Sequence, residues 1–157
     1  MIDTAAAEKA KIVFDTLCAC IEMRNWSFDK DEDRLLVHFV VSGDDLPMRF
    51  IMIVDAERQL VRLLSQMPFS VPEDKRIEGA IATCAATNTL ANGCFNYDIS
   101  DGSIGFRMSA SFRESEIGED LFSYMIDFAC AAVDEFNDKL WGVSKGFLSI
   151  SDFLKSI

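Results

Sequence analysis

The sequence predicts an α+β fold of the order α-β-β-β-α-β-β-α, in which an antiparallel sheet packs against helices. Asp101-Gly102 stands between two alternating runs, residues 93–99 and 103–108. This is a strong hairpin signal, because both residues of a two-residue turn need a positive φ. Residues 34–67 contain three extended runs joined by short turns. Segments before and after these strands repeat apolar residues at helical spacing.

The N-terminal half is predicted to be a helix followed by an antiparallel meander. Strands are expected at 34–42, 46–54 and 59–67. The turns at 43–45 and 55–58 are too short for a crossover, so neighbouring strands must run antiparallel. The helix is expected over residues 4–24, where an apolar stripe at helical spacing consists of Ala10, Val13, Phe14, Leu17 and Ile21.

The C-terminal half is predicted to hold a second helix, the hairpin of residues 93–112 and a long helix. Ser70 and Glu73 have the spacing of a capping box, and Pro72 suits a first helical turn, so the second helix is expected to start there and to end near Asn92-Gly93. The long helix is expected over about 115–140. Its apolar stripe is so broad that the helix is either deeply buried or at a subunit contact. A short helix is expected at about 149–155. The apolar face of the second helix consists of Ile77, Ala80, Ile81, Cys84 and Ala85.

Length and charge place the chain in a broad class. Its 157 residues fit one domain, 1–157. The 26 acidic and 15 basic residues give a net charge of −11, which argues against binding to nucleic acid or to an anionic membrane surface, since both need a basic face. The sequence has no apolar run close to the roughly 20 residues of a membrane span, and residues 1–11 lack the pattern of a signal peptide. We therefore expect a cytoplasmic protein.

Catalytic, cofactor and metal motifs are absent from the sequence. It contains no Gly-x-Gly-x-x-Gly, Walker or Gly-x-Ser-x-Gly pattern. The one histidine, His38, lies mid-strand among apolar residues, as is typical of a satisfied structural side chain. Cys18 and Cys20 point to different sides of a helix and cannot share a metal ion. We expect a protein that is not an enzyme and that has no cofactor and no metal.

The remaining polar clusters and cysteines are interpreted as structural. The acidic run Asp29, Asp31, Glu32 and Asp33 is expected to be a solvated turn, because it lacks the alternation of a calcium loop. An acidic edge on the long helix is expected to face solvent; it consists of Asp127, Asp134 and Asp138. Four cysteines with apolar neighbours are predicted to be reduced core residues, namely Cys18, Cys20, Cys84 and Cys130.

The first three strands are apolar on both sides. If helices cover one side, the other exposes a larger apolar patch than a monomer normally tolerates. Either another helix or the tail covers that patch, or it binds a second copy or a protein partner, with its arginines steering acidic groups. One side includes Val37, Phe39, Phe50, Met52, Val61 and Leu63. The other is the candidate interface, made up of Leu36, His38, Val40, Arg49, Ile51, Ile53, Arg62 and Leu64.

Three local signatures resemble those of the YbjN-like family, bacterial proteins labelled sensory transduction regulators. They are Pro68-Phe69-Ser70-Val71-Pro72, Asn88 with the run 93–98 after it, and Asp101-Gly102 followed by Phe106-Arg107. The resemblance covers roughly 5–142, and the family is similar in fold to type III secretion chaperones. Those chaperones are small, acidic, cytoplasmic homodimers that bind extended segments of a partner.

The resemblance implies a non-enzymatic protein-binding or chaperone-like regulatory module that forms a homodimer. It implies no catalytic residues. The alternative function is a small-molecule sensor. Its ligand pocket would lie between the sheet and the long helix, lined by Phe106, Met108, Met125 and Phe128.

Overall fold

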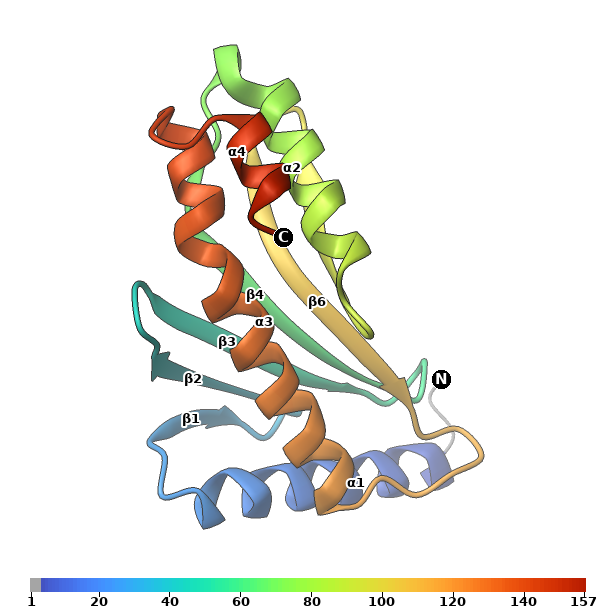
Figure 1. Cartoon of the computed structure of the whole chain (residues 1–157). Coiled ribbons are helices and arrows are strands. Elements are labelled where there is room, and N and C mark those ends of the chain that lie inside the picture. The colour runs from blue at the N-terminus through green and yellow to red at the C-terminus, as the bar shows by residue number, and fades with distance from the viewer. Residues whose placement is uncertain (1–3) are drawn as a thin grey trace.

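A computed structural model describes residues 4–157 and folds them into an antiparallel sheet with helices beside it (Figure 1). Within this range the sheet has six strands in the order β1-β2-β3-β4-β6-β5. The α+β class is confirmed, with one strand more than predicted. The elements are α1 (Thr4–Met23), β1 (Phe28–Asp31), β2 (Leu36–Ser42), β3 (Pro47–Asp55), β4 (Leu60–Ser70), η1 (Glu73–Lys75), α2 (Arg76–Asn88), β5 (Cys94–Asp98), β6 (Ser103–Ser111), α3 (Glu119–Lys145) and α4 (Ile150–Lys155).

The helices lie on one side of the sheet (Figure 1). α1 packs on β3, while α3 packs on β3, β4 and β6. α2 packs on β5, α3 and α4. Successive strand residues point to opposite sides of a sheet, so one residue in two faces this helical layer and is buried. The buried strand residues include Val37, Phe39, Phe50, Met52, Val61 and Leu63.

The sheet opens into a fork between β3 and β4. Their pairing runs from Asp55↔Leu60 to Ile51↔Leu64 and stops there, although both strands continue. Beyond that point β3 stays paired with β2, and β4 stays paired with β6. Figure 1 shows the two halves of the sheet diverging, with α3 crossing in front of the opening. Along the fork, the edge of β3 and the edge of β4 that face each other are therefore not paired.

Strand β1 is missing from the sequence prediction, which assigns the acidic run to a solvated turn. Asp29 and Asp31 instead lie in β1, where Asp29 pairs with His38 of β2. Glu32 and Asp33 do form a turn. The prediction fails for β1 because the strand is short and lies at the sheet edge, where charged side chains remain solvated and the backbone alone supplies the pairing.

The start of α2 also differs from the prediction. Ser70 is the last residue of β4, and a 3-10 turn precedes the helix, so the expected capping box does not form. The backbone explains this, because the Val71 N–H donates to the Gly102 carbonyl at 2.8 Å and prolongs the strand pairing instead. The helix ends at Asn88, earlier than predicted, while Gly93 lies in the following loop with φ 70°.

The β5–β6 hairpin is confirmed, but its loop is longer than a two-residue turn. Asp98 pairs with Ser103, so residues 99–102 form the loop. Gly102 has φ 77° and donates its N–H to the Asp98 carbonyl at 2.8 Å. Asp101 keeps a negative φ, and its carboxylate accepts the Ser103 N–H at 2.8 Å. The Asp-Gly pair thus closes the hairpin through a side-chain hydrogen bond and one left-handed glycine.

The long helix α3 begins and ends later than predicted. It starts after Gly118 and runs to Lys145, where Gly146 closes it with φ 78°. Left-handed glycine is the usual helix terminator, because it adopts this φ without a steric cost. The short helix α4 is confirmed. Ser149 caps it, since its hydroxyl accepts the Asp152 N–H at 3.1 Å.

Candidate functional site

The candidate interface residues lie together on the side of the sheet away from the helices, which we call the outer face. The strand register sets them in rows. His38 pairs with Ile51, which pairs with Leu64. In the next row Leu36 pairs with Ile53, which pairs with Arg62, and Val40 pairs with Arg49. The outer face comprises Leu36, His38, Val40, Arg49, Ile51, Ile53, Arg62, Leu64 and, from β6, Arg107.

The centre of the outer face is apolar and in contact with solvent. Val40 is 55% exposed and Ile51 is 40% exposed, while Leu36, Ile53 and Leu64 are half-buried by their neighbours. Within residues 4–157 the helices pack on the opposite side. The two apolar sides that the sequence predicts are therefore both present, and the chain's own described elements cover the inner one.

His38 is exposed on the outer face, and its Nδ1 lies 3.4 Å from Oδ2 of Asp29 on β1. A strand position between buried residues is not itself buried, because alternate side chains point to opposite sides. The imidazole therefore belongs to the solvent-facing surface of the sheet.

Three arginines flank the apolar centre. Arg49 makes no ion pair with any residue in the described range. Arg62 has Nη2 3.9 Å from Oδ2 of Asp55, but the same oxygen lies 3.0 Å from Nη1 of Arg58. Its Nε is buried and lacks a hydrogen-bond partner among residues 4–157.

The third arginine, Arg107, is missing from the sequence prediction, which treats the hairpin separately from the first three strands. Its partner in the register is Leu64, and its Nε donates to Sγ of Cys94 at 3.3 Å. The signal was available, since Arg107 alternates with buried Phe106 and Met108. The sequence did not reveal that β6 lies beside β4. The centre of the outer face thus carries three arginines, while Asp29, Asp31, Asp55 and Asp98 lie on the same face, in the edge strands β1 and β5 and at the end of β3.

A groove of about 510 Å³ occupies the fork on the outer face, and we call it the fork groove. Gly105 keeps it open, because a Cβ at this position would lie 3.1 Å from both Asn96 Oδ1 and Gln66 Oε1. A hollow of about 410 Å³ adjoins it and shares Leu64; Arg62 and Arg107 line this second hollow. The fork groove is lined by Val40, Arg49, Ile51, Leu64, Gln66 and Asn96, among others.

Helix α2 presents a second apolar surface. Its predicted apolar residues do share one face, but that face points outward: Ile77 is 65% exposed and Ile81 is 43% exposed. Cys84 is exposed as well, so its assignment to the core is wrong. We call this face the α2 stripe, and it comprises Ile77, Ala80, Ile81, Cys84 and Ala85.

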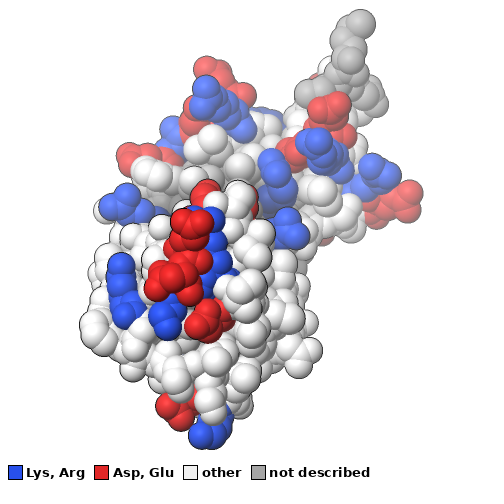
Figure 2. Space-filling view, turned by 90° about the horizontal axis from the view of Figure 1, so that it is seen from above, with Lys and Arg blue, Asp and Glu red and all other residues white. Residues whose placement is uncertain are grey.

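The opposite side of α2 packs inward because it is small. Its buried residues are Gly79, Ala82, Thr83 and Ala86. A Cβ on Gly79 would lie 3.0 Å from Val71 and from the Tyr97 hydroxyl, so the helix backbone approaches the sheet closely there. Thr83 satisfies its buried hydroxyl by donating to the Gly79 carbonyl at 2.7 Å. Figure 2 looks onto the end where α2 begins and α3 ends; charges of both signs form a strip there, beside uncharged surface.

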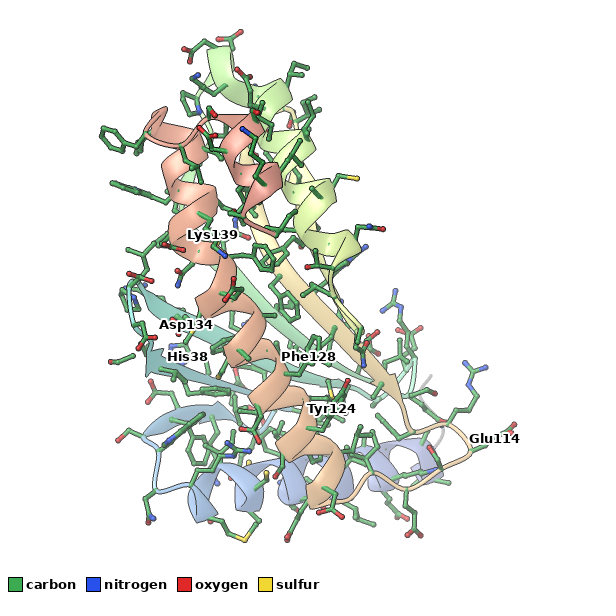
Figure 3. All side chains as sticks on the ribbon, in the orientation of Figure 1. His38, Glu114, Tyr124, Phe128, Asp134 and Lys139 are labelled. Carbon is green, nitrogen blue, oxygen red and sulfur yellow. The ribbon has the colours of Figure 1, made fainter. Side chains whose placement is uncertain are left out.

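The residues expected to line one ligand pocket are distributed over different parts of the structure. Phe106, Met108 and Met125 are at most 5% exposed and belong to the core. Phe106 also lines the fork groove, and Met108 lines the hollow that adjoins it. Phe128 lies with Tyr124 on α3, their ring centroids 5.8 Å apart (Figure 3). Phe128 lines a separate hollow of about 620 Å³ at the surface between α3, the end of α2 and the C-terminus.

The acidic edge of α3 has structural partners. Arg24 of the α1 end holds Asp127 at 2.6 Å, and Asp134 accepts the Asp44 N–H at 3.0 Å beside the β2–β3 turn (Figure 3). Asp127 and Asp138 are exposed, as predicted, and Asp134 is partly buried. Across the described range, groups of three or more His, Cys, Asp or Glu residues suited to a metal ion are absent.

The cysteines are free thiols. Cys18 and Cys20 are buried, as predicted, and Cys130 is partly buried. Burial raises the pKa of the Cys130 thiol to about 11, and it also raises the pKa of Cys18. These thiols stay protonated near neutral pH, so they act as packing groups rather than nucleophiles.

Comparisons with known proteins identify the fold. Neither a family model nor a curated protein sequence matches the chain. Among solved structures, YbjN from E. coli, a suggested transcription regulator, aligns with a TM-score of 0.56 and 11% identity, over 80% of this chain and 92% of that one. A chain from the HopA1–SchA chaperone–effector complex aligns with a TM-score of 0.55 and 14% identity, over 88% and 99%. The fold is therefore YbjN-like and chaperone-like, as the resemblance implies.

The two solved structures named above are a chaperone-complex component and a suggested regulator, not enzymes. At these identities the likeness concerns the fold alone. Within residues 4–157, none of the helices is both long and apolar enough to cross a membrane.

Proposed function

We propose that this chain is a non-enzymatic, chaperone-like or regulatory protein-binding module, which acts in the cytoplasm as a homodimer and holds a protein partner on the outer face of its sheet. The observation that carries the proposal is the uncovered outer face, where Val40 and Ile51 are about half exposed. Exposed contiguous apolar surface bordered by polar groups is typical of a protein interaction site. The chaperone–effector complex that shares the fold supports a protein as the partner.

The charges support giving the two apolar surfaces different occupants. A symmetric dimer contact must complement itself, since the same patch is present on both copies. The α2 stripe meets this condition, because its five residues are apolar or small and uncharged. The outer face is charged instead, with Arg49, Arg62 and Arg107 around its apolar centre. A self-contact there would have to set these arginines against Asp29, Asp31, Asp55 or Asp98, which already have partners within the described residues. We therefore propose that the α2 stripe joins two copies and that the outer face binds the partner.

The test is affinity capture from a native lysate with three versions of the chain. The wild type and Ile12→Asp, which changes a 67% exposed isoleucine on α1, should retain the same partner. The double variant Ile51→Asp/Ile53→Asp should lose it, because a carboxylate buried against an apolar partner is strongly unfavourable. Circular dichroism checks that each version is folded. Equal capture by all three would refute the outer face as the binding surface.

A further inference from the structure

We infer that the fork groove holds an extended peptide segment of the partner, in which acidic side chains stand beside aliphatic ones. This inference rests on the proposed function and specifies the chemistry of the partner. The position of the groove is the first argument. β3 and β4 stop pairing after Ile51↔Leu64, so the groove lies between two strand edges that face each other. Extended peptides bind such edges through main-chain hydrogen bonds, and neighbouring side-chain pockets give specificity.

The lining of the groove fits an extended segment with aliphatic side chains. Val40 and Ile51 form one wall, and Leu64 lies on β4 opposite them. Gln66 and Asn96 also line the groove, and their side-chain amides make no hydrogen bonds to other residues of the range 4–157. These amides are free to bond the main chain of a bound segment. The volume of about 510 Å³ is within the usual size of a ligand site.

The charge of the groove specifies acidic groups. Arg49 lines it without an ion pair from the described part of the chain, and Arg62 and Arg107 line the hollow that adjoins it at Leu64. The acids of the outer face already have partners within residues 4–157: Asp29 faces His38, Asp31 lies beside Arg34, Asp55 is held by Arg58, and Asp98 accepts the Ser100 N–H. A partner segment with carboxylates would supply the missing counter-charges.

Two other occupants fit less well. A second copy docked by symmetry would have to set its arginines against aspartates that already have partners, as argued above. A nucleic acid would meet three arginines but also a chain of net charge −11, and its binding would need more basic surface than that. The experiments distinguish both of these occupants from a peptide.

The test is selection from a random 12-residue peptide library displayed on phage, against the immobilised full chain. We expect selected peptides to place Asp or Glu beside Val, Ile or Leu. The best peptide is then synthesised, and fluorescence anisotropy measures its Kd. Arg49→Glu should raise the Kd at least tenfold, whereas Lys145→Glu, an equal charge change on the end of α3, should leave it unchanged. Replacing the peptide's acidic residue by Lys should restore binding to Arg49→Glu.

A second variant tests the shape of the groove. Gly105→Ala places a methyl group 3.1 Å from the Gln66 and Asn96 side chains, which can move, so the protein should fold and lose at least tenfold in peptide affinity. Selected peptides that lack acidic residues, a Kd that is unaffected by Arg49→Glu and Gly105→Ala, or tighter binding of a single-stranded oligonucleotide than of the peptide would each overturn the inference. Loss of partner capture by Ile51→Asp/Ile53→Asp would then still leave the proposed function standing.

Discussion

The α2 stripe gives a prediction whose size follows from its exposure. Ile77 is 65% exposed and Ile81 is 43% exposed. Burying a complete isoleucine side chain contributes about 2 kcal/mol, so burying the exposed fractions contributes about 1.3 and 0.9 kcal/mol. A symmetric dimer contains each side chain twice, which gives about 4 kcal/mol, a factor of roughly 10³ in the dimer Kd. Ile77→Asp/Ile81→Asp should therefore weaken the dimer at least that much.

Sedimentation equilibrium over a wide range of protein concentration measures this effect. The wild type should approach twice 17.6 kDa, and the double variant should remain at 17.6 kDa. Ile12→Asp is the matched control, because Ile12 is 67% exposed but lies on α1. The Cys84 thiol provides a second readout, since dimer formation should slow its reaction with a disulfide reagent. A wild type that stays monomeric at its highest concentration would refute the assignment.

Three further predictions concern stability and ligands. Gly102→Ala should lower the free energy of unfolding in urea by about 2 kcal/mol or more, because Gly102 has φ 77° and a Cβ would lie 2.0 Å from the Val71 carbonyl oxygen. A decrease below about 0.5 kcal/mol would show that alanine is not strained at this position. The Arg58 N–H donates to the Asp55 carboxylate and keeps the pKa of Asp55 below its ordinary value. This hydrogen bond therefore stabilises the fold fully above the unfolded-state pKa of about 4, and the stabilisation is lost as the pH falls through the lower folded-state pKa. Asp55→Asn should accordingly cost about 1 kcal/mol at neutral pH, with a gap to the wild type that narrows in acid, and a gap independent of pH would contradict this. In a thermal-shift screen we expect no metabolite to raise the Tm, because Met125 is buried in the core and Phe106, Met108 and Phe128 line three different hollows rather than one pocket; a metabolite that does so would favour the sensor alternative.

The strand alternation explains why the two sides of the sheet could be predicted from the sequence. Val37 and Phe39 were assigned to one side and Leu36 and His38 to the other, and the structure places them so. A period of two residues fixes sides without any knowledge of the tertiary structure. The same alternation could not place Arg107, because the position of β6 next to β4 depends on long-range pairing.

Local patterns failed where the backbone had a better alternative. Ser70 and Glu73 have the spacing of a helix cap, yet strand pairing continues through Val71, whose N–H bonds to Gly102. β1 was not predicted because its residues do not alternate between apolar and polar, so the sequence holds no strand pattern there. Its pairing with β2 through residues such as Asp29 is a property of the backbone.

The orientation of α2 shows what a hydrophobic pattern omits. The pattern identified one face of the helix correctly and suggested that Cys84 was buried. The opposite face of α2 packs against the sheet instead, because Gly79 has no side chain and lets the helix backbone come close to Val71 and Tyr97. Ile81 was left outside as a result. A set of small residues can therefore be the packing face of a helix, while the apolar face remains available for a partner.

The positions of the two apolar surfaces lead to a last prediction. α2 belongs to the helical layer, and the outer face lies on the other side of the sheet (Figure 1). A dimer formed through the α2 stripe would leave both outer faces free, so the two binding events should be independent. We expect Ile77→Asp/Ile81→Asp to abolish the dimer without changing the peptide Kd, and Ile51→Asp to abolish peptide binding without changing the dimer. Calorimetry should give one peptide per chain in the dimer and in the monomeric variant. One peptide per dimer would mean that the copies meet over the outer faces, and the assignment of the two surfaces would have to be reversed.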